Sequence, residues 1–363
     1  MTLLPARLDP VFVPRIWGSR TLAPLFPDKN QLTEPVVGKA SIGEIPIGEI
    51  WMTGNGCRFA SNAPDGLAGK ALGDVWSSLP IEWTGTAAQG KSFPLLVKFL
   101  FPREKLSVQV HPGDEYARQC EASAGGVGKT EMWYVIAGDA GAGVLINLKP
   151  GVTPSSFRRA IAEGTAEGSL EFLSIKTGDA VFVPAGTVHT IGPGLVLCEI
   201  QQNSDITYRV FDYERRDTKG ELRPLHLEKA LAVMNFGEQT GGKIDPVQIP
   251  RGAVTETFYV ACRHFAIEKW EFSEDISAIT SGDHFDLLII LEGEGAFERD
   301  GQSLPYSTAH VWLIPAALGA YHLAPTTRTT LLRTYVPPNA ADLAHRLTRC
   351  GVPESTLSRL IHP

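Results

Sequence analysis

The sequence predicts a mainly β protein made of two antiparallel jelly-roll barrels with inserted helices, and three observations favour this class. The 36 glycines and 26 prolines form about 17% of the 363 residues, against about 12% in average proteins, and both residue types favour turns over helix interiors. Short apolar runs between these turns recur along the chain, which is typical of β proteins. A strand ending at a proline occurs in both halves, as AVFVP at 180–184 and VWLIP at 311–315, which indicates two similar barrels.

The first half combines short strands with two inserted helices. Residues 66–79 predict a helix from the spacing of their apolar side chains. Residues 153–163 predict another, because Thr153 can cap its N-terminus and Pro154 suits its first turn. The strands expected here are residues 93–101, 105–111, 132–136, 170–175, 180–183, 195–201 and 207–211.

The second half resumes the strand pattern after a break in the chain. Residues 224–235 predict a helix, and residues 239–254, which contain prolines and glycines, predict a linker or exposed loop. Asn339 is expected to cap a last helix that ends at Cys350. The strands expected here are residues 258–262, 266–272, 285–291, 310–314 and 330–335. A chain of this length favours two domains, which we assign to residues 1–237 and 238–363.

Composition excludes several classes of function. Lys and Arg number 33 and Asp and Glu number 40, which gives a net charge of −7, and no strongly basic run is present, so we expect no nucleic-acid partner. The strongest apolar stretch, residues 93–101, is too short to cross a membrane and contains Lys98. The N-terminus has no apolar region before a small-residue cleavage site, so no signal peptide is expected.

The cysteines indicate a reducing compartment. They are five in number, widely spaced and never in a CxxC pair: Cys57, Cys120, Cys198, Cys262 and Cys350. A disulfide framework or a cysteine zinc site is therefore not expected. The cytoplasm is the simplest location for such a chain.

Two segments place polar residues on one face of an expected strand. In SVQVHP at 107–112, strand alternation puts Ser107, Gln109 and His111 on one side and two valines on the other. This pattern suits a polar barrel interior, although an edge strand facing solvent would show it as well. In KTEMWYVI at 129–136, Lys129 and Glu131 share a face, which a surface ion pair would also explain.

Two further segments lie where strands end. In GDAVFVPAGTVH at 178–189, a glycine turn, an apolar strand and a Pro-x-Gly turn would hold His189 in one orientation. In QQNSDITYR at 201–209, an apolar strand runs into a polar cluster, and Arg209 could bind an anion through two hydrogen bonds or form an ordinary surface salt bridge.

Together these segments supply a plausible ligand set for a divalent metal. His111 and His189 offer imidazoles, Glu131 a carboxylate and Gln109 an amide oxygen. A Zn²⁺ ion held by this set keeps a formal charge of +1 and can act as a Lewis acid. With Lys129 and Arg209 nearby, a positive pocket in an acidic protein indicates a small anionic substrate, for which a phosphorylated sugar is suitable.

The motifs jointly resemble those of the type I mannose-6-phosphate isomerases of the cupin superfamily. Residues 178–189 are similar to the second cupin motif, and Glu131 with Gly138 to the end of the first, whose usual His-x-His is here Gln109-x-His111. The resemblance covers residues 10–235 well and the second half loosely. It extends to these further segments: PRIWGS at 14–19, GEIW at 48–51, FPLLVKFL at 93–100, GPG at 192–194 and VFDYER at 210–215.

The resemblance implies a role for each matching residue. One zinc ion per chain would bind Gln109, His111, Glu131 and His189. The family's active-site arginine matches Arg209, and its lysine and serine match Lys129 and Ser107, which implies roles in substrate and phosphate binding. Three residues match positions lining the pocket: Trp17, Glu49 and Lys98.

The implied reaction interconverts mannose 6-phosphate and fructose 6-phosphate through a cis-enediol. Arg209 is the expected stabiliser of the enediolate, and the sequence leaves zinc-bound water, Glu49 and Asp205 open as the general base. We expect a cytoplasmic monomer. The second half lacks a His-x-His pair, so we expect a degenerate, structural domain without metal, in which His284, His310 and His322 are core or surface residues.

Two other classes stay open on the same fold. A metal-dependent oxygenase would need iron and open coordination positions, and Gln109 argues against it. A non-catalytic sugar-binding cupin would bind ligand without turnover, and the intact metal set argues against that.

Overall fold

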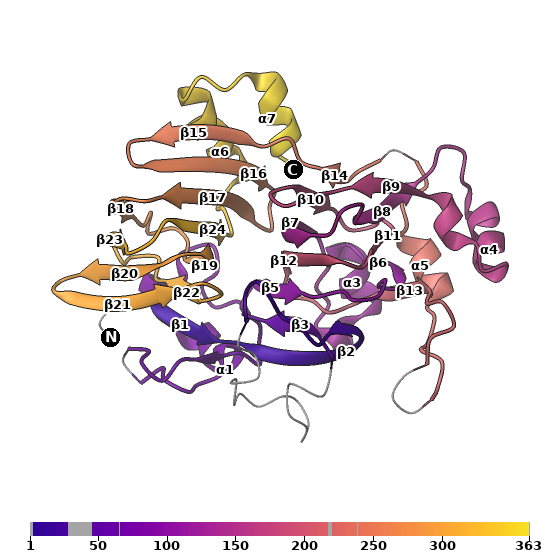
Figure 1. Cartoon of the computed structure of the whole chain (residues 1–363), viewed down its shortest axis with the longest axis horizontal. Coiled ribbons are helices and arrows are strands. Elements are labelled where there is room, and N and C mark those ends of the chain that lie inside the picture. Colours follow the sequence, from indigo (N-terminus) through magenta and orange to yellow (C-terminus); the bar gives the residue numbers. More distant parts are fainter. Residues whose placement is uncertain (1–2, 28–45, 65, 217–219, 238, 363) are drawn as a thin grey trace. The chain divides into compact units, whose positions relative to one another are not determined.

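The structure is a computed structural model that describes residues 3–27, 46–64, 66–216, 220–237 and 239–362 (Figure 1). Its four sheets are antiparallel, so the chain is mainly β, as the sequence predicts. The four sheets remain separate, and in the described parts they do not close into continuous barrels. None of the helices in these parts is long and apolar enough to span a membrane.

The chain forms two compact units, each built from separated segments. The N-terminal unit comprises Phe12–Trp51 and Leu96–Lys243, and the C-terminal unit comprises Met1–Val11, Met52–Leu95 and Ile244–Pro363. The last crossing, after Lys243, lies near the boundary expected at residue 237. Met1–Val11 and Met52–Leu95, which the prediction placed in the first domain, nevertheless belong to the C-terminal unit, where β1 (Ala6–Asp9) pairs with β22 (Val311–Ile314).

The N-terminal unit contains a seven-stranded and a five-stranded sheet. The larger has the order β14-β10-β7-β12-β5-β3-β2 and the smaller β13-β6-β11-β8-β9. The larger sheet is made of β2 (Val11–Ser19), β3 (Ile47–Trp51), β5 (Leu95–Leu100), β7 (Glu131–Gly138), β10 (Ala180–Val183), β12 (Leu195–Gln202) and β14 (Gly242–Lys243). The smaller sheet is made of β6 (Val108–Val110), β8 (Gly143–Leu148), β9 (Leu170–Ser174), β11 (His189–Ile191) and β13 (Tyr208–Phe211).

The C-terminal unit contains an eight-stranded sheet, β15-β16-β17-β24-β19-β22-β1-β4, and a four-stranded sheet, β18-β23-β20-β21. In addition to β1 and β22, the larger holds β4 (Arg58–Phe59), β15 (Val247–Arg251), β16 (Val254–Ala261), β17 (Ala266–Phe272), β19 (Asp286–Glu292) and β24 (Thr329–Tyr335). The smaller holds β18 (Ile276–Ile279), β20 (Glu294–Arg299), β21 (Gln302–Ser307) and β23 (Ala320–Pro325).

The helices are short. The N-terminal unit carries α3 (Asp114–Cys120), η3 (Ala122–Ala124), α4 (Pro154–Ala162), η4 (Ala166–Ser169) and α5 (Leu227–Val233). The C-terminal unit carries α1 (Leu72–Val75), η2 (Trp76–Ser78), α2 (Ile81–Thr84), α6 (Ala340–Arg349) and α7 (Glu354–Leu360). Two predicted caps are present, because the side chains of Thr153 and Asn339 accept backbone N–H groups at the starts of α4 and α6.

Two sequence predictions differ from the structure. The helix expected over residues 66–79 is only α1 and η2, because Gly66 and Gly69 have φ of 74° and 73°, which no α-helix accommodates. The linker expected over residues 239–254 contains β15, which pairs with β16 at the sheet edge. Its Pro250 is tolerated there because an edge strand needs fewer N–H donors.

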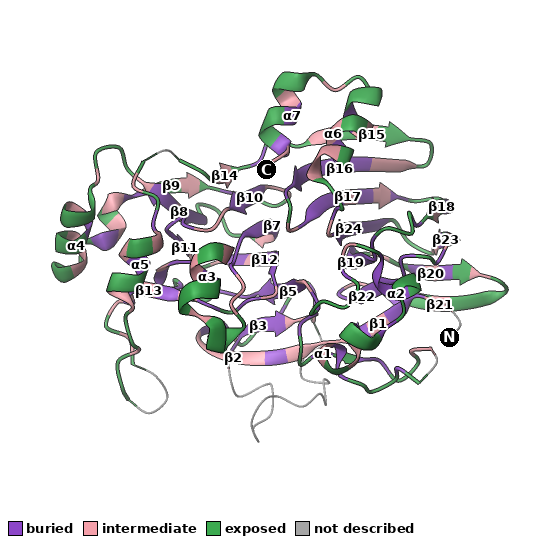
Figure 2. Ribbon diagram, turned by 180° about the vertical axis from the view of Figure 1, so that it is seen from behind, coloured by how far each residue is buried: buried purple, intermediate pink, exposed green. Residues whose placement is uncertain are grey.

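Each unit has its own apolar core. Figure 2 shows that the strands are largely buried, whereas α4, α6 and α7 expose much of their surface. In the N-terminal unit, Trp133 and Val183 from the larger sheet and Ile146 from the smaller belong to one buried cluster. In the C-terminal unit, Trp312 and Phe297 from its two sheets likewise share a cluster. Polar groups inside either unit therefore stand out against an apolar interior.

The predicted repeat holds at the level of strand register. The strand before Pro184 is β10, and its last residue, Val183, lies opposite Glu131. The strand before Pro315 is β22, and its last residue, Ile314, lies opposite Asp286. Glu131 and Asp286 therefore occupy matching positions in the two units.

Candidate metal centre

Three buried side chains of the N-terminal unit form a cluster suited to a metal ion. Atoms of His111, Glu131 and His189 that can act as ligands all lie within 4.8 Å of one another. The carboxylate comes from the first residue of β7 in the larger sheet, whereas His189 begins β11 in the smaller. His111 directly follows β6, the strand next to β11. The two sheets of the N-terminal unit thus both contribute side chains to the cluster.

Backbone carbonyls orient both imidazoles. Nδ1 of His111 lies 2.9 Å from the carbonyl oxygen of Ile206, and Nδ1 of His189 lies 2.9 Å from that of Thr187. A carbonyl only accepts, so each Nδ1 carries the proton and each Nε2 presents a lone pair to the cluster. Burial, followed by the charge of Lys129, lowers the pKa of His111 well below 6.5, and burial lowers the pKa of His189 to about 4. Both rings are therefore neutral near pH 7, as metal ligands must be.

The Glu131 carboxylate meets the cluster without hydrogen bonds. It is fully buried, and neither of its oxygens has a hydrogen-bond partner within the described residues. Its Oε1 lies 3.3 Å from Nε2 of His189 and 3.7 Å from Nε2 of His111, and its Oε2 lies 3.0 Å from Nζ of Lys129. An ionised carboxylate is costly to bury without compensation. Lys129 compensates this charge at Oε2, whereas Oε1 faces the lone pairs of the two imidazoles, and a divalent cation fits between these three atoms.

Gln109 is next to this cluster, but its amide nitrogen faces inward. That nitrogen lies 3.3 Å from Nε2 of His189, while Oε1 accepts a hydrogen bond from the Ser107 hydroxyl at 3.2 Å. Coordination through the amide oxygen requires the amide to turn by 180°. After this turn the amide nitrogen would face the Ser107 hydroxyl, which can accept its N–H, and the amide oxygen would face the cluster.

The Pro-x-Gly turn holds His189 as the sequence suggests. Gly186 has a φ of 85°, and a Cβ there would lie 2.9 Å from the carbonyl oxygen of Val233. Its N–H donates to the carbonyl of His111 at 2.8 Å. The turn is thus hydrogen-bonded to the backbone of His111, and Thr187, the residue after Gly186, orients the ring of His189.

A cavity of about 420 Å³ adjoins the cluster in the same unit. Gln109 and Lys129 line it, so it reaches the cluster. The other predicted site residues on its wall are Trp17, Glu49, Lys98, Ser107 and Arg209. The structure therefore brings every residue that the sequence singled out for the site into the cluster or onto the wall of the cavity.

Arg209 enters the cavity from β13. Strand pairing places Gln109 opposite both His189 on β11 and Arg209 on β13, so these three residues form a row across the smaller sheet. The Arg209 Nε atom is buried and has no hydrogen-bond partner among the described residues. Arg223 also lines the cavity. Because Asp212 pairs with Arg223, the positive charge of this part of the wall comes mainly from Arg209.

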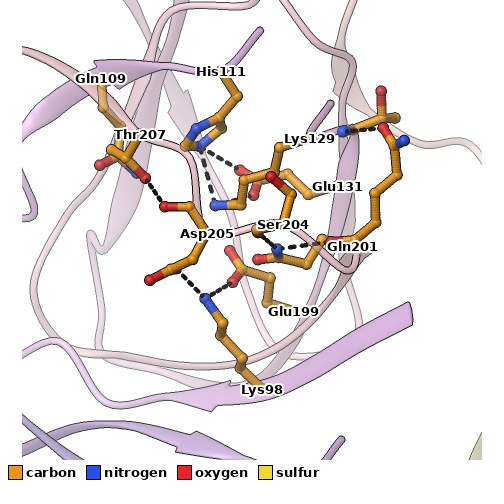
Figure 3. A network of polar contacts seen from close by, with 12 residues as sticks. Lys98, Gln109, His111, Lys129, Glu131, Glu199, Gln201, Ser204, Asp205 and Thr207 are labelled. Carbon is orange, nitrogen blue, oxygen red and sulfur yellow. Dashed lines mark hydrogen bonds and ion pairs between the residues drawn. The ribbon is translucent and has the colours of Figure 1, made fainter. Parts of the chain in front are cut away.

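Further charged side chains line the cavity, among them Lys98, Glu199 and Asp205 (Figure 3). Nζ of Lys98 lies 3.2 Å from Asp205, 3.7 Å from Glu199 and 3.8 Å from Glu49. Glu49 also accepts two hydrogen bonds from Arg15, at 2.8 and 3.0 Å. Burial raises the pKa of Glu49, but Lys98 and Arg15 outweigh it and lower that pKa to about 2. Burial and the charge of Glu131 raise the pKa of Glu199 to about 7.

The acidic and basic residues of the cavity wall that sequence reasoning missed include Arg15, Glu199 and Arg223. Glu199 interrupts the apolar strand β12, and this was the available signal, because a buried carboxylate in such a strand needs a partner or a function. Arg15 follows a proline in β2 and Arg223 precedes one, and neither interrupts an apolar run, so they gave no comparable signal.

The histidines of the C-terminal unit lie apart from one another. His284 is buried and stacks on Tyr335, with ring centroids 4.1 Å apart. His310 is half-buried and lies 3.2 Å from Arg7, and His322 is exposed beside Ser277.

Family models match both parts of the chain. Residues 6–130 match the model described as phosphomannose isomerase type I, catalytic domain. Residues 255–336 match the model described as mannose-6-phosphate isomerase, cupin domain. The second match lies in the half where the motifs alone gave only a loose resemblance.

Individual relatives agree with these matches. ManA of Bacillus subtilis, a mannose-6-phosphate isomerase, is 33% identical over 325 residues, or 89% of this chain and 96% of the relative. GmuF of the same organism, named "Probable mannose-6-phosphate isomerase", is 36% identical over 89% of this chain and 96% of its own length. A crystal structure of the mannose 6-phosphate isomerase from Bacillus subtilis superposes with a TM-score of 0.78 at 29% identity, covering 91% of this chain and 99% of that one.

A zinc-bound mannose 6-phosphate isomerase shares the fold, with a TM-score of 0.69 at 17% identity over 92% of this chain and 99% of that one. The family matches and the extended identity confirm the resemblance found in the motifs. The chain belongs to the type I phosphomannose isomerase family.

Proposed function

We propose that this protein is a zinc-dependent isomerase that interconverts mannose 6-phosphate and fructose 6-phosphate. The observation that carries the proposal is the buried cluster of His111, Glu131 and His189 beside a cavity lined by cations and carboxylates. Membership of the type I phosphomannose isomerase family supports the choice of substrate.

One zinc ion per chain is assigned to His111, Glu131 and His189, with Gln109 as the fourth ligand. The inward lone pairs of the neutral imidazoles and the unsatisfied carboxylate oxygens support this set. When bound, the ion would supply Lewis-acid stabilisation of negative charge on sugar oxygens. The catalytic domain is then the N-terminal unit, and the C-terminal unit is assigned no metal.

The cationic side of the cavity is assigned to the substrate's anionic groups. Arg209, with its free buried Nε, and Arg223 can donate to phosphate or to a developing enediolate oxygen. Lys129 adds a charge beside the cluster, and the Ser107 hydroxyl, now donating to Oε1 of Gln109, can accept from the amide nitrogen once the amide has turned. Trp17 is almost fully buried and forms an apolar part of the wall.

Proton transfer between C2 and C1, through a cis-enediol, needs a general base within reach of the sugar, and three carboxylates of the cavity wall are candidates beside zinc-bound water. Glu49 is held by Arg15, Trp51 and Lys98, which suits a positioning role for it. Glu199 and Asp205 both contact Lys98, but Asp205 exposes 54% of its side chain and Glu199 only 6%. We assign the proton transfer to Glu199, because a carboxylate shielded from water is a stronger base than one whose charge is stabilised by solvent.

The decisive experiment is a coupled isomerase assay on mannose 6-phosphate with metal analysis of the same sample. Chelation should abolish activity, and zinc should restore it. His111→Ala should lose both zinc and activity. Full activity in metal-free protein would overturn the zinc proposal, and ligand binding without turnover would favour a sugar-binding cupin. Iron with oxygen uptake would favour an oxygenase.

The proposed setting is the cytoplasm, with the protein as a monomer. None of the five cysteines forms a disulfide, which supports a reducing compartment. Light scattering of the purified chain gives its mass, and a dimer would contradict the monomer assignment.

A further inference from the structure

The C-terminal unit contains a polar cluster at the position that the metal centre occupies in the N-terminal unit. Asp286 matches Glu131 in strand register, as described above. Arg333 on β24 lies opposite Leu288, two residues beyond Asp286, and Glu199 on β12 lies opposite Trp133, two residues beyond Glu131. Arg333 therefore matches Glu199. The C-terminal unit thus has polar residues at the same two strand positions as the N-terminal unit, but the residue types differ.

A guanidinium group is the central cation of this second cluster. Arg333 donates to Glu268 and, at 3.0 Å, to Asp286, and both carboxylates are 2% exposed. Asp286 also lies 3.2 Å from Nδ1 of His284. The charges are arranged in the opposite way to those of the Lys98–Glu199 pair. In the N-terminal unit β12 carries the acid, Glu199, whereas the matching strand of the C-terminal unit, β24, carries the cation, Arg333.

Stability alone does not explain such a cluster. Buried ion pairs are often no more stabilising than apolar residues of the same volume, because both charges must lose their hydration. The neighbouring interior is apolar, with Leu288, Leu331 and Trp312 packed together. Burial raises the pKa of Asp286, but Arg333 and His284 outweigh it and lower that pKa below its usual value, so the carboxylate is charged at neutral pH.

The cluster opens into a cavity of about 580 Å³ that lies wholly within the C-terminal unit. This volume is typical of small-molecule sites. Aromatic rings of Trp270, Tyr321 and Tyr335 line it together with Arg333, Asp286 and His284. Four arginines and four carboxylates contribute to its wall, so the charges balance.

We propose that this cavity binds an uncharged polyhydroxylated molecule of monosaccharide size. Sugar hydroxyls both donate and accept hydrogen bonds, which matches a wall of guanidinium, carboxylate and hydroxyl groups. Tyr335 and Trp270 offer a ligand their edges, because His284 stacks on Tyr335 and the Arg333 guanidinium lies 4.7 Å and 5.5 Å from the centroids of the two rings. A balanced wall favours a neutral ligand over an anion, in contrast to the arginine-lined side of the first cavity.

The test is a titration of the full-length chain with D-mannose and, separately, with inorganic phosphate, followed by ligand-observed NMR. Ser281 is an exposed residue on the cavity wall, and Ser303 is an exposed residue of the same unit outside it. Ser281→Trp should weaken D-mannose binding at least tenfold by filling the mouth. Ser303→Trp should leave it within twofold, and both variants should keep the isomerase activity of the parent.

Three results would overturn the proposal. The first is that D-mannose does not bind at tens of millimolar. The second is that Ser281→Trp and Ser303→Trp bind D-mannose equally well. The third is that the parent binds phosphate and not D-mannose, and that Ser281→Trp abolishes this phosphate binding. A second variant covers the case in which Ser281→Trp fails to fold. Tyr335→Phe should weaken D-mannose binding about fivefold, whereas Tyr306→Phe, in a buried ring that does not line the cavity, should not.

Discussion

The ammonium group of Lys129 lies 3.0 Å from Oε2 of Glu131, the carboxylate at the centre of the candidate metal site. The same Nζ lies 3.2 Å from Nε2 of His111. One cation therefore contacts two of the atoms that a divalent ion would bind. Competition between the two cations is a direct consequence of this arrangement.

Replacing Lys129 by Met should separate metal binding from catalysis. Without the ammonium group, zinc should bind several-fold more tightly, because a like charge next to its ligands is lost. The kcat/KM for mannose 6-phosphate should fall about 100-fold, because a cation near the reacting oxygens is lost. Zinc titration and the coupled assay measure the two effects. Lys105→Met, which removes an exposed lysine paired with Glu167, is the control and should change neither. Weaker zinc binding by Lys129→Met would contradict this interpretation.

Glu199→Gln should stop proton transfer without removing the metal. The amide keeps the volume of the side chain and its contact with Trp133, at 3.1 Å from the indole nitrogen in the parent. It cannot accept a proton, so kcat should fall about 10²- to 10⁴-fold. Zinc content should equal that of the parent. Solvent deuterium should no longer enter the substrate at C2, and exchange at the parental rate would exclude Glu199 as the base.

Arg209→Ala should raise the KM for mannose 6-phosphate by a larger factor than the factor by which it lowers the zinc content. A charge-assisted hydrogen bond to phosphate contributes about 1.5–3 kcal/mol, which corresponds to roughly 10- to 100-fold in kcat/KM. Arg209→Lys should recover only part of this loss, because a lysine cannot donate two parallel bonds. Arg158→Ala removes an exposed ion pair with Glu228 and serves as the control. A KM equal to that of the parent would show that Arg209 does not bind the phosphate.

Glu49 should make stability depend on pH in the acidic range. Its pKa is about 2 in the folded chain against 4.5 for an ordinary glutamate, so its ionised form stabilises the fold above pH 4.5 and this contribution disappears as pH falls towards 2. The contribution is about 3 kcal/mol near neutral pH and about 1 kcal/mol at pH 3. The stability difference between the parent and Glu49→Gln should therefore shrink from pH 6 to pH 3 in denaturant titrations. Glu104→Gln, at an exposed glutamate, should show little difference at either pH. A constant difference for Glu49→Gln would exclude this linkage.

Arg333→Met should destabilise the C-terminal unit by about 3–5 kcal/mol, because it leaves two buried carboxylates without their cation. Adding Glu268→Gln and Asp286→Asn to the same chain should restore much of the loss. Arg328→Met removes an exposed ion pair with Glu271 and should cost less than about 1 kcal/mol. Denaturant titration compares the variants. An equal effect of Arg333→Met and Arg328→Met would show that the cluster is not a buried charge network.

The sequence was informative where structure depends on near neighbours. The caps at Thr153 and Asn339, and the turn that carries His189, follow from residues a few positions apart. The metal cluster was also accessible, because His111, Glu131 and His189 sit in motifs whose residue types have specific chemistry. Local reasoning failed over residues 66–79, where apolar spacing suggested a helix and two glycines with positive φ prevent most of it.

Features that depend on distant pairing were not accessible from one sequence. The assignment of residues 1–11 to the C-terminal unit depends on β1 pairing with β22, and no local pattern encodes that partner. Glu199 reaches the cavity because β12 lies between β7 and β5. Its contact with Lys98 therefore depends on strand order, which a residue pattern does not specify.

The carbonyl groups that orient the two histidines have a consequence for how this site tolerates mutation. Their partners are the main-chain oxygens of Ile206 and Thr187, which every amino acid provides. A side-chain substitution at either position leaves the acceptor in place, provided that the backbone does not move. The protonated nitrogen of each ring is thus protected from most single mutations, and genetic drift can change residues 187 and 206 without changing which nitrogen faces the candidate metal site.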